Sequence, residues 1–99
     1  MRFNFDFNDS KYLAEVFIEP KTESATVKIS EKNRSTGVAD TIGAYLLNTV
    51  PPDEMETEKM QRRIAQQAIE RFAGGSPKNF HFNFDLTKHD EPMNLDLAG

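Results

Sequence analysis

The sequence predicts an α+β fold, in which an antiparallel sheet of four to five strands carries one long amphipathic helix on one face. Three observations predict it. Stretches with Phe at alternate positions open and nearly close the chain, at 2–9 (RFNFDFND) and 79–87 (NFHFNFDLT). The segment 51–75 between them has the apolar spacing of an amphipathic helix. Alternation also marks the segments 12–19 and 24–30 as strands.

The first third of the chain predicts an antiparallel meander. Residues 3–7 alternate Phe with Asn or Asp, which is typical of a half-buried strand. The turn-forming residues 8–11 (NDSK) lead into a second strand at 12–19. Pro20 ends that strand because proline cannot donate to a ladder. A third strand follows at 24–30, and its alternation again separates a core face from a polar face.

The segment 38–50 leaves two structures open. Val38, Ile42 and Tyr45 have the spacing of one helix face, which favours a helix. Gly43 argues against it, since glycine costs about 1 kcal/mol inside a helix. The stretch AYLLNTV would also serve as a buried fourth strand.

The segment 51–75 predicts the one long helix. Its prolines and acidic residues suit the amino end, and Glu58 and Arg62 are spaced to form an ion pair. Gly74 and Gly75 supply a left-handed cap at its end. The apolar stripe that we expect to lie on the sheet consists of Met60, Ile64, Ala65, Ala68, Ile69 and Phe72.

Most of the eight Phe residues lie in the two terminal strands. Aromatic pairs across adjacent strands stabilise a sheet by about 0.2–1 kcal/mol each. We therefore predict that the terminal strands are neighbours, or nearly so, beneath the helix.

Length and composition limit the class of protein. A chain of 99 residues suits one domain. We predict a domain over residues 1–90 and an acidic, partly flexible tail over 91–99. The chain has no Cys, which excludes disulfides, thiolate metal sites and Cys nucleophiles. We expect a cytoplasmic protein, with neither a signal peptide nor a membrane span.

The polar side of the terminal strands is a first candidate site. If those strands were adjacent, Asp6, His81 and Asp85 would converge, and one His with two carboxylates can bind a divalent metal. The simpler interpretation is the solvent-exposed face of a sheet, because the spacing matches no metal motif. A flat polar face of this kind could also bind a partner, and the sequence favours this over a metal site. The polar residues concerned are Asn4, Asp6, Asn8, His81, Asn83 and Asp85.

The outer face of the predicted helix is a second candidate. Arginine side chains one helical turn from glutamines can bind phosphates. The simpler interpretation is that a charged outer face makes the solvent side of the helix soluble. The net charge of −4 argues against nucleic acid as the ligand. The stretch 73–79 (AGGSPKN) predicts a helix cap rather than a phosphate loop, since it follows a helix. The face comprises Lys59, Arg62, Arg63, Gln66, Gln67 and Arg71.

The tail is a third candidate. Met93, Leu95 and Leu97 alternate with polar residues, which predicts either a strand on a sheet edge, of this chain or of another, or a free linear motif. Leu95, Asp96 and Leu97 are also loosely similar to the peptide by which many proteins bind the bacterial sliding clamp. Ala98 stands where that motif has its aromatic anchor.

We predict from these observations a small intracellular interaction protein that acts by protein–protein contact, as an accessory, adaptor or inhibitor, with a homodimer as one arrangement. No motif indicates a catalytic residue, a cofactor or a membrane partner. The first alternative is a nucleic-acid or phosphate binder that uses the Arg-bearing helix face. The second is a metal-dependent protein centred on Asp6, His81 and Asp85. The expected partner-binding residues are Arg62, Arg63, Gln66, Met93, Leu95 and Leu97.

Overall fold

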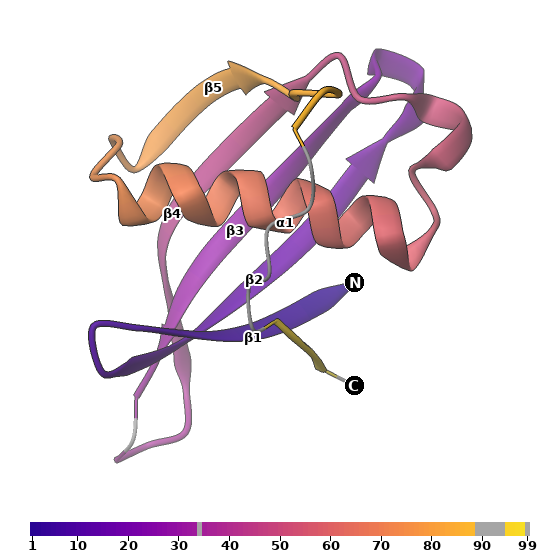
Figure 1. The fold of residues 1–99 in the computed structure, drawn as a ribbon. Coiled ribbons are helices and arrows are strands. Elements are labelled where there is room, and N and C mark those ends of the chain that lie inside the picture. The colour runs from indigo at the N-terminus through magenta and orange to yellow at the C-terminus, as the bar shows by residue number, and fades with distance from the viewer. Residues whose placement is uncertain (34, 89–94, 99) are drawn as a thin grey trace.

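The computed structural model is an α+β fold with one helix packed on a six-stranded sheet (Figure 1). It describes residues 1–33, 35–88 and 95–98. The strands lie in the order β5-β4-β3-β2-β1-β6. Their bounds are β1 Arg2–Phe7, β2 Ser10–Glu19, β3 Ser24–Lys32, β4 Ala39–Asn48, β5 Asn79–Asn83 and β6 Asp96–Ala98, and the helix α1 is Glu58–Ala73.

The first three predicted strands are confirmed as a meander. β1 and β2 pair antiparallel through a tight hairpin in which Phe7 lies opposite Ser10. Asn8 and Asp9 between them both adopt the left-handed conformation, with φ of 50° and 64°. Asn and Asp suit this two-residue turn because their short side chains tolerate positive φ. A short 3-10 turn at Pro20–Thr22 then ends β2.

Of the two structures left open at 38–50, the strand is confirmed and the favoured helix is wrong, because the segment forms strand β4 beside β3. Gly43 was the residue that argued against a helix in the sequence, and the structure gives its physical reason. A Cβ atom at Gly43 would lie 3.2 Å from the carbonyl oxygen of Lys78, so glycine lets β5 approach closely. The ladder also shifts register between Ile29 and Ser30, and this irregularity disturbs the alternation of β4.

The long helix is confirmed, although it is shorter than predicted. A 3-10 turn occupies Pro52–Glu54, and α1 begins only at Glu58. Thr57 caps it by accepting a hydrogen bond from the backbone N–H of Met60 at 3.1 Å. At the other end Gly75 has φ of 84°, which agrees with the predicted glycine cap.

The last predicted strand pairs differently from the expectation. The helix α1 leads the chain back over the sheet, so β5 enters parallel to β4 rather than antiparallel to a neighbour. A strand, a helix and a parallel strand form one crossover unit. The six-stranded sheet is therefore mixed, which corrects the predicted antiparallel sheet of four to five strands.

The prediction that the two Phe-rich strands are neighbours is wrong. β1 and β5 are separated by β2, β3 and β4. Both strands turn Phe toward the helix all the same, and the helix reaches both. The Phe72 ring packs edge-on at 5.2 Å from Tyr12 and 5.6 Å from Phe7, while the Arg71 guanidinium lies 4.8 Å from the Phe82 ring. The repeated pattern thus builds the two flanks of one core.

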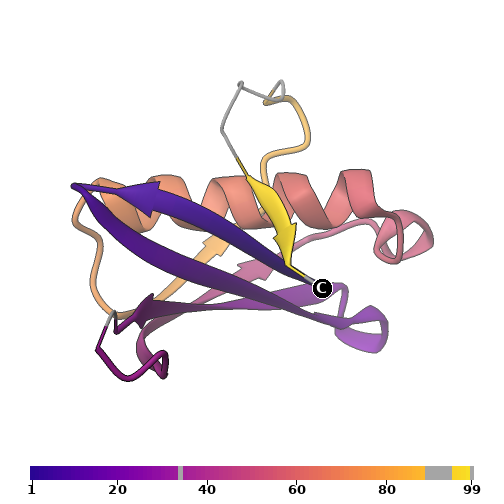
Figure 2. The same cartoon turned by 90° about the horizontal axis from the view of Figure 1, so that it is seen from below.

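The other side of the sheet carries no second layer within the described ranges (Figure 2). We call this side the open face. No described helix is long and apolar enough to cross a membrane.

Candidate functional site

The outer side of α1 is occupied by the chain itself. Residues 84–88 follow β5 and bind the outer side of α1, and Leu95 also binds α1 directly before β6, which lies beside β1 (Figure 1). We call residues 84–88 and Leu95 together the crossing segment. The predicted partner-binding residues of the helix lie beneath or beside this segment, so their geometry shows first what they do within the molecule.

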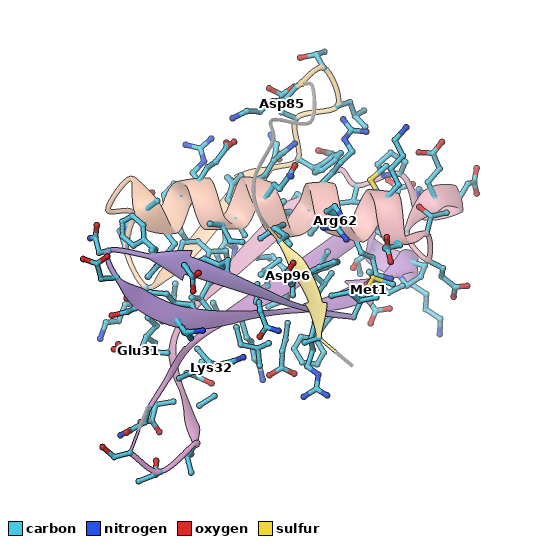
Figure 3. The ribbon with its side chains drawn as sticks, turned by 60° about the horizontal axis from the view of Figure 1, so that its bottom comes forward. Met1, Glu31, Lys32, Arg62, Asp85 and Asp96 are labelled. Carbon is cyan, nitrogen blue, oxygen red and sulfur yellow. The ribbon has the colours of Figure 1, made fainter. Side chains whose placement is uncertain are left out.

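Arg62 connects the helix to the carboxyl end of the crossing segment. Its Nη1 donates to the backbone carbonyl of Leu95 at 2.6 Å, and its guanidinium lies 5.2 Å from the centre of the Phe3 ring. Nη2 also lies 3.5 Å from Glu58, which confirms the predicted ion pair. In Figure 3 Arg62 lies beside β6, and Asp85 projects from the loop at the far side of the helix. This arginine therefore joins α1, β1 and the residue before β6.

Arg63 connects the helix to the other end of the crossing segment. It donates to the backbone carbonyls of Leu86 at 3.2 Å and of Lys88 at 3.1 Å. Its guanidinium also lies 5.3 Å from the buried ring of Phe84. Phosphate binding at Arg63 would have to compete with these two carbonyls.

Gln67 completes the attachment with a two-way hydrogen bond to Asp85. The Gln67 amide donates to the Asp85 carbonyl and accepts from the Asp85 N–H, both at 2.9 Å. The Gln67 side chain therefore gives the Asp85 backbone the two hydrogen bonds that a neighbouring strand would give it within a sheet. Lys88 and Glu70 form an ion pair next to it.

The Asp85 carboxylate organises the turn that follows β5. It accepts hydrogen bonds from the Thr87 hydroxyl at 2.7 Å and from the Thr87 N–H at 2.9 Å. These bonds, the hydroxyl first, lower the pKa of Asp85 below its ordinary value. The carboxylate is exposed, so its role is local.

The remaining residues of the predicted helix face divide between the interior and solvent. Gln66 and Gln67 are buried, although the prediction placed them outside. Lys59 is exposed. Gln61 is buried too, and its Oε1 has no hydrogen-bond partner within the described part of the chain. The helix is thus enclosed on two sides, by the sheet and by the crossing segment.

The residues of the predicted metal site are not brought together. Asp6 lies on β1, whereas His81 lies on β5, on the far side of three other strands. Asp85 is engaged with Thr87 in the turn beyond β5. Among the residues that the structure describes, no group of three or more His, Asp or Glu side chains could hold a metal ion.

The tail forms an edge strand of its own sheet. Asp96–Ala98 pair antiparallel with Arg2, Phe3 and Asn4 of β1. Leu95 is buried in the core, whereas Leu97 is 50% exposed. Of the alternatives for this segment, the structure shows the strand on the sheet of the same chain. Met93 lies outside the described residues, and the division into a domain at 1–90 and a tail at 91–99 stays a prediction.

Two hollows lie near the β1–β2 hairpin and the adjoining ends of β3 and β4. One has a volume of about 460 Å³, and a neighbouring one has about 370 Å³. The side chains of Lys11 and Lys32 contribute to both, and Lys32 donates to the side-chain oxygen of Asn4. Acidic side chains line the same hollows, so neither presents one sign of charge. Those acidic residues are Asp6, Glu31, Asp40 and Asp96.

The open face combines His81 of the first candidate site with Phe17, a residue that the sequence analysis did not single out. The strand register places Phe17 opposite Thr26, Thr26 opposite Leu46 and Leu46 opposite His81, which forms one row across four strands. Phe17 is 47% exposed. The signal was present in the sequence, since a Phe among the glutamates of the polar side of a strand is not needed by the core.

Charged residues flank this aromatic side chain. The Lys28 ammonium lies 5.1 Å from the centre of the Phe17 ring, which is a cation–π distance. In the adjoining row Arg2 lies opposite Glu15, and Glu15 opposite Lys28. The open face therefore combines one exposed ring with a surround of both charges.

Comparison with known proteins yields one limited likeness. No protein-family model matches the chain, and no solved structure matches it. The chain is 28% identical over 74 residues to mannitol-1-phosphate 5-dehydrogenase of Aspergillus terreus. The match covers 75% of this chain and 19% of that protein, so the chain spans about a fifth of the length of this relative.

Proposed function

We propose that this chain is a small protein-binding module whose open face receives another protein. The observation that carries the proposal is Phe17, an aromatic side chain 47% exposed on a sheet face that no described element covers. Aromatic side chains are enriched among the residues that dominate binding energy, because they bury a large area with few rotatable bonds.

The surroundings of Phe17 support a protein as the ligand. An interface commonly places an apolar or aromatic centre inside a polar rim. Phe17 lies in the row with Thr26 and Leu46, and the neighbouring row carries Glu15 and Lys28. A rim of both charges fits a partner surface of mixed charge better than it fits a polyanion.

The Arg-bearing helix face supports this choice of surface. A partner or a phosphate at Arg62 or Arg63 would have to replace carbonyls of the crossing segment, which these side chains hold in the free protein. Leu95 is likewise part of the core. We therefore place the interface on the sheet, and the predicted binding roles of the helix and tail residues remain untested.

The activity of the similar dehydrogenase is not part of the proposal. Dinucleotide binding uses a glycine-rich turn between a strand and the following helix, where backbone N–H groups meet the pyrophosphate. The corresponding connection here, residues 49–57, contains no glycine. A cytoplasmic location, expected from the absence of Cys, remains a part of this proposal that a localisation experiment has to test.

The test is quantitative capture of partners with matched variants. Tagged wild-type protein, Phe17→Ser and the control Val38→Ser are each incubated with extract of the source cells, and captured proteins are quantified by mass spectrometry. Val38 directly precedes β4 and is 58% exposed, so the control removes similar apolar area elsewhere. We expect a partner whose recovery falls at least about tenfold with Phe17→Ser alone, the loss of a central aromatic contact. Equal recovery with all three proteins would refute the open face as the interface.

A further inference from the structure

We propose that two copies of this chain associate through the outer edges of their β5 strands, so that two sheets continue as one. This inference does not rest on the proposed function. β5 ends the sheet, and no described strand pairs with its outer edge. An edge strand exposes backbone donors and acceptors that another strand can use.

The backbone of β5 shows which groups face outward. The Lys78 carbonyl accepts from the Ala44 N–H at 2.7 Å, and the Phe84 N–H donates to the Asn48 carbonyl at 2.8 Å. These even-numbered residues therefore direct their polar groups toward β4. Because the direction alternates along a strand, the outward N–H and C=O groups belong to Asn79, His81 and Asn83.

The sequence of β5 is a palindrome, Asn-Phe-His-Phe-Asn. In an antiparallel pair centred on His81, every residue meets its own kind in the other copy: His81 meets His81, Phe80 meets Phe82, and Asn79 meets Asn83. The outward residues fall in the positions that exchange two backbone hydrogen bonds. The Phe residues fall in the alternate positions, where opposite side chains lie closest. This self-complementarity indicates a second copy as the occupant, related by a two-fold axis.

The composition of β5 also lacks the usual protection of an edge. Edge strands are commonly kept apart by Lys, by proline, by inward charges or by short length. Residues 79–83 contain neither an acidic residue nor Lys, Arg or Pro. At the other end of the sheet, β6 has three residues and carries Asp96. The β6 edge of the sheet is thus protected against pairing with another strand, whereas the β5 edge can accept one.

The first experiment measures mass by light scattering after size exclusion, over a range of protein concentrations. We expect the wild type to reach the mass of a dimer. His81→Pro removes an outward donor from each copy without removing a β5–β4 hydrogen bond, and we expect dimerisation at least about tenfold weaker. His81→Thr keeps the backbone donor and serves as the matched control, which should still dimerise. Thermal melts verify that each variant is folded.

The second experiment tests the register. The double variant Asn79→Lys with Asn83→Lys places like charges opposite each other at both ends of the pair, and should be monomeric. The double variant Asn79→Lys with Asn83→Glu places opposite charges there, and should dimerise in a salt-sensitive manner. A wild type that stays monomeric, a dimer that persists in His81→Pro, or equal behaviour of the two double variants would each overturn the proposal.

Discussion

The two edges of the sheet use the same alternating Phe pattern but end it differently. At one edge β1 is covered by β6, a strand of three residues that Arg62 holds through the carbonyl of Leu95. At the other edge β5 has no described neighbour on its outer side, and the chain leaves it through the Gln67–Asp85 pair. Strand β6 covers the first edge, which we call the closed edge, whereas no described strand covers the outer side of β5, which we call the open edge.

This difference shows how one helix can serve two flanks. Side chains of α1 that point away from the sheet do not simply face solvent, because they bind the crossing segment that connects the two edges. The attachment at Arg62 secures the closed edge, and the attachment at Gln67 secures the exit from the open one. Variants at the two edges therefore measure separately how much each edge contributes to the free energy of unfolding.

The largest expected effect is at the closed edge. Phe3 lies on β1 and its ring is fully buried in the core, so Phe3→Ala should lower the free energy of unfolding by about 4 kcal/mol. The matched change at the open edge, Phe82→Ala, removes a half-buried ring and should lower it by about 2 kcal/mol. Urea unfolding in dilute solution measures both. An equal loss in the two variants would show that the edges contribute alike.

The sequence was sufficient to predict those strands, and the helix, that are buried on one side only, because one-sided burial imposes a regular apolar pattern. The alternation at 3–7, 12–19 and 24–30 and the stripe of α1 follow from one buried face, and the structure contains all of them. The error at 38–50 came from β4 being a central strand with a register shift, whose spacing imitates a helix. With that strand missed, the crossover that makes β5 parallel could not be recognised.

The partners of polar residues were not predictable in the same way. Arg62, Arg63 and Gln67 have the spacing of a solvent-exposed helix face, and only residues 84–88 and Leu95 give them partners within the chain. Nothing local in the sequence encodes which backbone carbonyls will lie above them. Phe17 did carry a local signal, since it interrupts the polar side of β2, but its significance depends on the open face having no second layer among residues 1–33, 35–88 and 95–98.

The next largest effect concerns the attachment of β6. Arg62→Ala removes a charged hydrogen bond to Leu95 and the stacking over Phe3, and should lower the free energy of unfolding by about 2 kcal/mol. Amide exchange at Asp96, whose N–H faces Asn4 of β1, should accelerate more than exchange at Phe82, because the loss is at the closed edge. Lys59→Ala, an exposed change on the same helix, is the control and should alter neither. Uniform acceleration at both edges would contradict a local role for Arg62.

A smaller effect is expected at the exit from β5. Gln67→Ala removes both hydrogen bonds to the Asp85 backbone and should lower the free energy of unfolding by about 1 kcal/mol. Here the acceleration of exchange should fall on the Phe84 and Asp85 amides and spare the Asp96 amide, which faces β1. Gln67→Glu is the informative companion, since its carboxylate can accept from the Asp85 N–H but cannot donate to the Asp85 carbonyl. A variant Gln67→Glu as stable as the wild type would show that the donated bond contributes little.

The smallest effect is a pH dependence at the same exit. The hydrogen bonds from Thr87 lower the pKa of Asp85 in the folded state, so they stabilise the fold above the pKa of the unfolded chain. This stabilisation is lost as the pH falls through the folded pKa, because the carboxyl then binds a proton. The stability difference between the wild type and Asp85→Ala should therefore be constant near neutral pH, and it should shrink as the pH falls below the unfolded pKa of Asp85 and through its lowered folded pKa. Asp85→Asn keeps an oxygen acceptor but cannot titrate, so the part of the wild-type acid sensitivity that comes from this turn should be absent in it. A difference between wild type and Asp85→Ala that stays constant to the lowest pH would mean that the turn depends on the shape of the side chain and not on its charge.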